Sequence, residues 1–199
     1  MTDADASPDG PEVGPANGAA VVGARPEDAR AIAEVHVASW RQAYAEQLPP
    51  AYLASLSVTD RETMWRELLQ AGRAQVLVAQ SGASIVGFAA FGACRDDEPP
   101  AGRMELWALY LAPPVWSRGI GRALWQAVEA QLRAQHAASV SLWVIESNER
   151  ARRFYSAAGF ELDSGAQNTF TLGGVELREL RLVRRLAGRS AGAEASSFV

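Results

Sequence analysis

Two amphipathic helices are predicted by the spacing of apolar side chains in the first third of the chain. Apolar residues recur every three or four positions over residues 32–44 and again over residues 64–69, which places them on one face of a helix. Pro26 suits the start of the first helix, and residues 59–62 form a capping box that predicts the start of the second. His36 falls on the apolar face, where a hydrogen-bonded core histidine is favoured over a catalytic one.

Short apolar runs bounded by turn residues predict the strands of a mixed sheet. Residues 76–79 and 84–91 flank a Gln-Ser-Gly-Ala turn, which is typical of a hairpin. A helix with a buried stripe of Leu124, Val128 and Leu132 separates two later strands, so these two strands are predicted to run parallel. The predicted strands are residues 20–24, 76–79, 84–91, 103–111, 140–145, 160–162 and 175–182.

The composition is that of one folded domain with a tail at each end. Hydrophobic residues make up 48% and charged residues 21% of the 199 positions, which is ordinary for a globular core. Residues 1–18 and 187–199 are rich in small and polar residues and poor in large apolar ones. They are therefore predicted to be disordered, and residues 19–186 are predicted to form the domain.

Charge and cysteine content disfavour several classes of protein. The net charge of −4 comes mainly from the acidic N-terminal tail, and residues 19–186 carry equal numbers of acidic and basic residues. Nucleic acid is therefore not a predicted partner. One cysteine, Cys94, and two histidines do not make a zinc site, so no metal is expected. No apolar run approaches the ~18 residues of a membrane span and no secretion signal is visible, so we expect no membrane association and a cytoplasmic location.

The strongest chemical signal is a glycine loop, residues 116–122, between an apolar strand and an amphipathic helix. Glycines let the backbone approach a ligand, and the start of a helix directs unpaired N–H groups and a partial positive charge toward it. Arg118 and Arg122 add positive charge, so a pyrophosphate ligand is predicted. A dinucleotide fingerprint needs a third glycine where Leu124 stands, and a Walker loop needs a lysine, which the chain lacks.

A second motif lies downstream, in residues 142–160. It comprises an apolar strand, Asn148 at the turn into a helix, Phe154 and Tyr155 on that helix, and Gly159 at its end. Together with the glycine loop it resembles the GCN5-related N-acetyltransferase (GNAT) superfamily, which uses acetyl-coenzyme A. The first motif of that family, Gln/Arg-x-x-Gly-x-Gly/Ala, is matched by residues 116–121 except at Trp116, and the resemblance covers residues 20–186.

The resemblance implies both a fold and an activity. The fold is an α/β fold of the GNAT type, a mixed central sheet of six or seven strands flanked by four helices and splayed between the two middle parallel strands. The activity is transfer of an acetyl group from acetyl-CoA to a primary amine of a small molecule or peptide. Direct attack in a ternary complex is favoured, because no partner base marks Cys94 as an acyl carrier.

Two alternative functions stay open, a non-catalytic acyl-CoA sensor and a nucleotide-binding module. The sequence does not identify the amine acceptor, because the loops that line the acceptor groove decide it and the fold does not. Homodimers are common in the family, and the sequence leaves the oligomeric state open.

The resemblance also implies which residues bind acetyl-CoA. Backbone groups of the strand before the glycine loop would bind the pantetheine arm, and one N–H there would polarise the thioester carbonyl. Asn148 would also bond that arm, although asparagine is equally a good helix cap. Arg150, Arg152 and Arg153 are expected to form a solvated face, with contact between one of them and a coenzyme phosphate as the alternative. The implied cofactor-binding residues are Leu109, Tyr110, Leu111, Trp116, Ser117, Arg118, Gly119, Ile120, Gly121, Arg122, Asn148, Ala151, Phe154 and Tyr155.

Two residues are candidates for proton transfer. Tyr155 is turned about 100° from Phe154 around the helix, so it is free to face the coenzyme sulfur as a proton donor, with structural packing as the alternative. Glu105 interrupts an apolar strand at a site where family members often place a general base, with solvation as the alternative. Trp40 and Tyr44 end the first helix, which borders the acceptor groove in this family.

Overall fold

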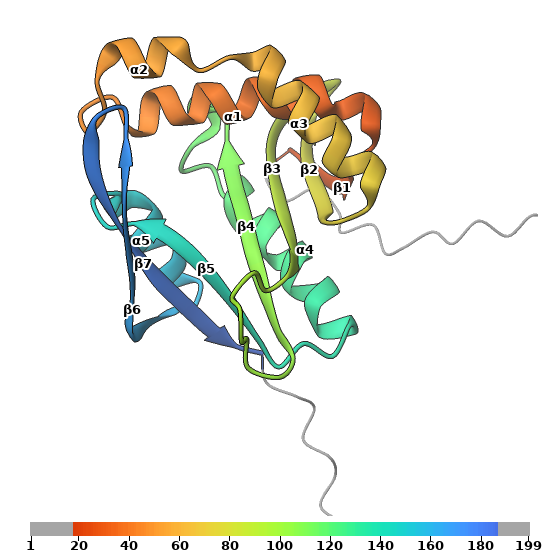
Figure 1. Cartoon of the computed structure of the whole chain (residues 1–199). Helices are drawn as coiled ribbons and strands as arrows, with labels where there is room; N and C mark the ends of the chain where they lie inside the picture. Colours follow the sequence, from red (N-terminus) through yellow and green to blue (C-terminus); the bar gives the residue numbers. More distant parts are fainter. Residues whose placement is uncertain (1–17, 187–199) are drawn as a thin grey trace, which may run out of the picture.

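Seven strands form one sheet with helices on both of its faces (Figure 1). The structure is a computed structural model that describes residues 18–186, so the two predicted tails lie outside the described residues apart from Gly18. In chain order the elements are β1 Ala20–Gly23, α1 Ala29–Ala43, α2 Pro50–Ser55, α3 Val58–Ala71, β2 Gln75–Ser81, β3 Ser84–Ala93, β4 Arg103–Leu111, α4 Ile120–Ala134, β5 Ser139–Ile145, α5 Glu149–Ala157, β6 Glu161–Leu172 and β7 Val175–Arg185.

The sheet opens between its two parallel strands. The strand order is β1-β2-β3-β4-β5-β7-β6, and only β4 and β5 run parallel. They pair at their beginnings alone, through residues 103–105 of β4 and 139–141 of β5. Farther along, β4 stays paired with β3 up to Leu111 and β5 stays paired with β7 up to Ile145, so a gap separates β4 from β5 (Figure 1). The predicted mixed sheet, splayed at its middle parallel strands, is confirmed.

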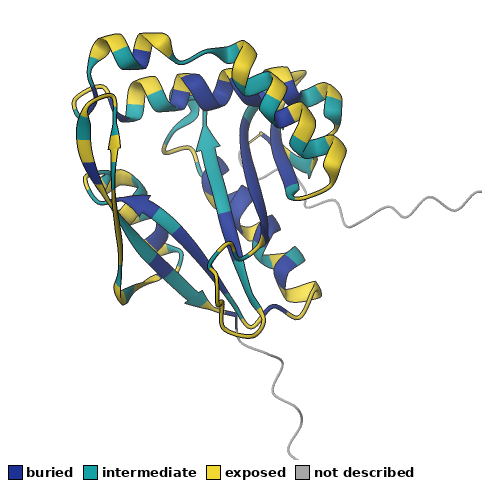
Figure 2. Ribbon diagram, in the orientation of Figure 1, coloured by how far each residue is buried: buried dark blue, intermediate teal, exposed yellow. Residues whose placement is uncertain are grey.

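Two apolar cores hold the helices against the sheet. On one face, Ile32 of α1 and Trp65 of α3 pack with Phe88 of β3. On the other face, Leu124 and Val128 of α4 belong to a second core, which α5 and the end of the sheet complete. Figure 2 shows the buried positions along the strands and on the helix sides that face them. These two layers support the gap from both sides.

A bulge in β4 changes the face to which its side chains point. Ala90 of β3 is opposite Ala108, but the next residue of β3 is opposite Leu106, so Trp107 is an extra residue in β4. Before the bulge, Leu106 packs in the core under α4, whereas after it Ala108 and Tyr110 pack in the core under α1 and α3. A bulge re-aims side chains in this way because strand alternation restarts one residue later. The bulge was not predicted from the sequence.

Two predicted boundaries differ from the structure, and one helix was not predicted. The helix α3 begins at Val58 and not after Thr59, because the hydroxyl of Ser57 accepts a hydrogen bond from the backbone N–H of Asp60 at 3.1 Å. The helix α2 was not predicted, because six residues are too few to show helical periodicity. The last hairpin is longer than expected, and its register shifts between Leu162 and Gln167.

Neither a membrane helix nor a metal cluster occurs in residues 18–186. No helix there is both long and apolar enough to cross a bilayer. Within the same residues, no three side chains of His, Cys, Asp or Glu gather closely enough to hold a metal ion.

Candidate active site

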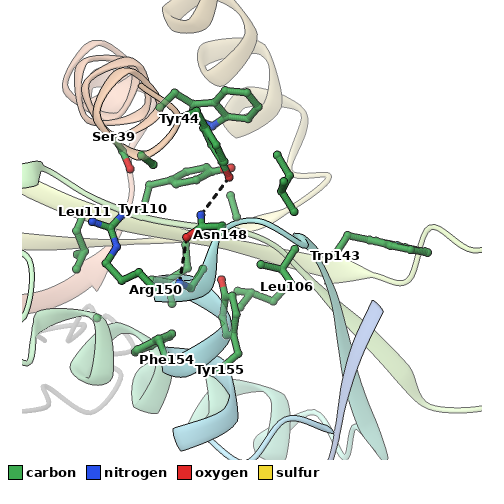
Figure 3. Close-up of a pocket in the computed structure, with 18 of the residues that line it drawn as sticks. Ser39, Tyr44, Leu106, Tyr110, Leu111, Trp143, Asn148, Arg150, Phe154 and Tyr155 are labelled. Atoms are coloured by element: carbon green, nitrogen blue, oxygen red, sulfur yellow. Dashed lines mark hydrogen bonds between the residues drawn. The ribbon is translucent and has the colours of Figure 1, made fainter. Parts of the chain in front are cut away.

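A cavity of about 270 Å³ lies in the gap between β4 and β5 (Figure 3). Its wall is built by α1, β4, the glycine loop, β5, α5 and β7. The structure brings most of the predicted site residues together here. Those that line the cavity are Trp40, Tyr44, Leu109, Tyr110, Leu111, Trp116, Ser117, Gly121, Asn148, Ala151, Phe154 and Tyr155.

Five predicted residues do not line this cavity. Gly119, Ile120 and the exposed Arg118 and Arg122 belong to the glycine loop and the first turn of α4, next to lining residues. Glu105 is the fifth and has a different environment. Its side chain is only 2% exposed, and both of its carboxylate oxygens accept hydrogen bonds from Arg95. The backbone N–H of Arg95 donates to Oε2 at 2.8 Å and its Nε donates to Oε1 at 3.1 Å.

The position of Glu105 follows from the alternation of β4. Before the bulge, Leu106 points to the core under α4, so Glu105 points to the opposite face. There it holds the loop after β3 through Arg95. Its predicted role as general base stays a prediction, and the geometry does not favour it, because the carboxylate is engaged by Arg95 and does not line the cavity.

The glycine loop leaves the start of α4 open. Gly119 is the N-cap residue with a φ of 81°, a conformation that favours glycine, and no side chain caps the helix. The first N–H groups of α4 therefore have no side-chain cap. Space beside them is limited, since a Cβ on Gly121 would lie 3.3 Å from Cδ1 of Leu111 and 3.4 Å from Cε2 of Phe154. A thin anionic ligand fits this arrangement better than a bulky side chain would.

Asn148 connects α5 to α1 across the cavity. Its Oδ1 accepts a hydrogen bond from the backbone N–H of Ala151 at 3.1 Å, which caps α5. Its Nδ2 donates to the hydroxyl of Tyr44 at 3.2 Å. Figure 3 shows both bonds, with Tyr44 above and Tyr155 below Asn148 in this view. The helix-capping alternative is confirmed, and contact with a pantetheine arm stays a prediction.

Two tyrosines in the cavity wall hold their protons strongly. Burial is the largest cause that raises the pKa of Tyr155 far above the ordinary value, and the nearby Tyr110 adds to the rise. Burial likewise raises the pKa of Tyr110. Both hydroxyls are therefore protonated at neutral pH and are able to donate a hydrogen bond. Figure 3 shows the Tyr155 side chain extending from α5 toward Leu106.

Glu179 is a half-buried carboxyl group in the cavity wall that sequence reasoning missed. It lies on β7 opposite Ile145, the last residue of β5. Burial raises its pKa, and the side chain of Asn168 and the charge of Arg95 partly oppose the rise. A carboxylate whose pKa is raised is a stronger base, so Glu179 is suited to accept a proton. The segment around Glu179 alternates apolar and charged residues, so the sequence did not distinguish this glutamate from the solvated charges beside it.

His36 is part of the core, as predicted. Its side chain is 8% exposed, and its Nδ1 accepts a hydrogen bond from Nε1 of Trp65 at 3.1 Å. Its ring stacks on Tyr110 at a centroid distance of 5.0 Å. Burial lowers the pKa of His36 to about 3, so the ring is neutral at physiological pH and supports Tyr110 from behind.

The arrangement of this site matches a known family. The model of the acetyltransferase (GNAT) family matches residues 35–160, which include both sequence motifs and all of the cavity lining except Glu179. The chain belongs to the GNAT family. The uncharacterized N-acetyltransferase YuaI of Bacillus subtilis is 38% identical over 161 residues, which make up 80% of this chain and 88% of that protein. The predicted enzyme class, a GNAT-family N-acetyltransferase, is confirmed.

Solved GNAT-like structures share the fold. The PaiA N-acetyltransferase of Thermoplasma acidophilum, in complex with coenzyme A, has a TM-score of 0.62 at 22% identity and covers 80% of this chain and 96% of its own. YncA of Salmonella typhimurium, with its cofactor acetyl-CoA, has a TM-score of 0.65 at 19% identity and covers 87% and 97%. At these identities the likeness concerns the fold alone.

Proposed function

We propose that this GNAT protein transfers the acetyl group of acetyl-CoA to a primary amine by direct attack. The observation that carries the proposal is the single cavity in the gap, which joins the open start of α4 to a proton donor, Tyr155, and a proton acceptor, Glu179. Acetyl-CoA supplies a thioester that is activated for acyl transfer. The residues of this chain bind acetyl-CoA, align it with the amine and transfer the protons.

The gap offers groups that match the chemistry of the coenzyme. The side of β4 that faces β5 has no strand partner after Glu105, so its backbone groups are available to an amide-bearing arm such as pantetheine. The uncapped N–H groups at the start of α4 and the narrow space at Gly121 suit a diphosphate. A backbone N–H of residues 109–111 would polarise the thioester carbonyl.

Glu179 and Tyr155 have different roles in the proposed proton transfer. The attacking amine must lose a proton, because only the neutral amine is a nucleophile and a lysine-like amine has a pKa of about 10.4. Glu179 accepts that proton, directly or through water. As the C–N bond forms and the C–S bond breaks, the hydroxyl of Tyr155 supplies a proton to the departing sulfur.

Direct attack is supported by the placement of the only cysteine. Cys94 follows β3 and does not line the cavity, and its Sγ lies 3.8 Å from the hydroxyl of Ser141. Its sulfur therefore lies outside the lining that contains Glu179 and Tyr155. The presence of both proton-transfer groups in one wall also disfavours a non-catalytic acyl-CoA sensor.

A panel of amines tests the proposed function. Purified protein, acetyl-CoA and one amine at a time (aminoglycosides, polyamines, amino acids and peptides) are assayed for release of free thiol. We expect thiol release that depends on one class of amine, with an acetylated product in the mass spectrum. Binding of coenzyme A without turnover of any amine would support the sensor, and no binding would overturn the proposed site.

The variant Tyr155→Phe is expected to lower kcat about 10–10³-fold with little change in coenzyme affinity. The hydroxyl is lost, but the ring and its packing remain. The effect is limited at the upper end, because a thiolate with a pKa of about 8.5 is a fairly good leaving group. Steady-state kinetics and calorimetric titration of coenzyme A check the two parts. If the chemical step limits turnover and kcat is unchanged in the variant, Tyr155 has a packing role and does not act as a proton donor.

A further inference from the structure

An arginine and a tryptophan meet across the gap in the sheet. Arg150 is the second residue of α5, which follows β5, whereas Trp116 is the first residue of the glycine loop, which follows β4. The Cζ atom of Arg150 lies over the indole ring of Trp116, 3.2 Å from its centroid. Both residues line the cavity, and Figure 3 shows the Arg150 side chain reaching from α5 toward Leu111. The contact therefore joins the two sides of the mouth of the cavity.

Trp116 is a fixed platform for this contact. Its Nε1 donates a hydrogen bond to the backbone carbonyl of Leu111 at 2.8 Å, which ties the indole to the end of β4. Trp116 also stands at the position where the glycine-loop motif has Gln or Arg. The stacking brings a guanidinium to this position from a different element of the fold.

Arg150 has no ion-pair partner for its charge and no hydrogen-bond partner for its N–H donors among residues 18–186, whereas its two neighbouring arginines on the same helix are each engaged. Arg153 pairs with Glu149 at 3.0 Å, and Arg152 donates to the backbone carbonyl of Glu146 at 3.2 Å. Within residues 18–186, no carboxylate lies within ion-pair distance of Arg150. Arg150 remains exposed to solvent at the mouth of the cavity.

The stacking leaves the hydrogen-bonding capacity of Arg150 unused. A guanidinium that stacks on an indole uses the face of its plane, whereas its five N–H donors point outward within the plane. Those donors match the oxygen spacing of a phosphate and bind it through two parallel bonds. Stacking also limits the rotation of a long side chain, so less entropy is lost when the anion binds.

We propose that Arg150 binds the diphosphate of the coenzyme, and that Trp116 is a positioning residue that holds its guanidinium beside the glycine loop. The inference rests on the proposed function, because it assumes that coenzyme A occupies the gap. It assigns to one residue the phosphate contact that the sequence left among three arginines. The diphosphate would then lie between the N–H groups of α4 and a cation from α5.

Calorimetric titration of the full chain tests this assignment. We expect Arg150→Gln to weaken binding of coenzyme A about 10–100-fold, the range for a hydrogen bond to a charged group, and to make affinity less dependent on salt. Arg153→Gln removes the same charge from the same helix and should change affinity less than about twofold. Binding of pantetheine, which has no phosphate, should be the same in wild type and Arg150→Gln.

Two further binding measurements test which phosphate of the coenzyme Arg150 contacts and whether Trp116 acts through Arg150. Dephospho-coenzyme A keeps the diphosphate and lacks the 3′-phosphate, so Arg150→Gln should weaken its binding by the same factor as that of coenzyme A. Trp116→Leu should weaken coenzyme A binding in the wild-type background and cause no further loss in Arg150→Gln, since the tryptophan acts through the arginine.

The outcomes separate this inference from the proposed function. Wild-type protein that does not bind coenzyme A would overturn the proposed function. Equal affinity of the wild type and of Arg150→Gln for coenzyme A would overturn the role of Arg150 and leave the proposed function standing. A loss that disappears with dephospho-coenzyme A would overturn the diphosphate assignment, and additive losses in the double variant would overturn the positioning role of Trp116.

Discussion

Replacement of Glu179 by glutamine is expected to lower kcat/KM about 10²–10⁴-fold near neutral pH, with a smaller loss at higher pH. Glutamine keeps the shape of the side chain but accepts no proton. Near neutral pH most of an alkyl amine is protonated, so the reaction depends on the base. As the pH approaches the pKa of the amine, free amine accumulates and the base matters less. Profiles of kcat/KM against pH for wild type and variant measure the effect.

Glu105→Gln is the matched control for this experiment. It makes the same chemical change in a buried carboxylate on another strand, one that binds Arg95 and does not line the cavity. We expect kcat/KM to be retained near neutral pH, with at most a shift of the profile along the pH axis, because the charge of Arg95 also acts on the pKa of Glu179. A stability loss of about 1–3 kcal/mol should follow from the weakened bond to Arg95. The reverse result, a pH-dependent loss in Glu105→Gln and none in Glu179→Gln, would make Glu105 the base.

A glutamate at Gly121 is expected to abolish the rise in Tm that coenzyme A causes. At a ligand concentration of 100 times Kd, binding stabilises the native state by about 2.7 kcal/mol, which corresponds to a Tm rise of roughly 5–10 °C for a chain of this size. Gly121→Glu places a bulky anion where even a Cβ would lie 3.3 Å from Leu111. Both its volume and its charge oppose a diphosphate at the start of α4. Thermal unfolding with and without coenzyme A measures the difference.

The control for Gly121→Glu adds the same charge elsewhere on α4. Gln126 is exposed on that helix, so Gln126→Glu should keep the full rise in Tm. NAD should not stabilise the wild-type protein, because the loop lacks the dinucleotide fingerprint. A folded Gly121→Glu protein that still shows the full rise with coenzyme A would place the coenzyme away from the glycine loop.

Local signals allowed the sequence to predict much of this site. The glycine loop and Asn148 lie at strand-to-helix turns, where capping and turn chemistry leave recognisable residues, and Tyr155 lies on the helix that Asn148 caps. The parallel pair β4–β5 followed from the intervening helix, which excludes a hairpin. Each of these features is set by residues close together in the chain.

The features that were missed depend on pairing between distant strands. Glu179 reaches the cavity because β7 pairs with β5, and no local sequence pattern near residue 179 predicts that pairing. Glu105 was placed in the site by its position on β4, but the bulge at Trp107 makes the two halves of β4 point their side chains to opposite faces. Arg150 could not be distinguished from Arg152 and Arg153 until the fold brought Trp116 next to it.

The divergence of β4 and β5 gives a seven-stranded sheet two additional edges in its interior. An exposed edge strand is a template for pairing with other chains, and proteins often protect such edges to avoid aggregation. Here the inner edges lie between helices on both faces, with Trp116 and Arg150 across the mouth. A second β-strand has no lateral access to them, whereas a slender, flexible ligand does. The same enclosure thus protects these inner edges from pairing with a strand of another chain and restricts what binds to their unpaired backbone.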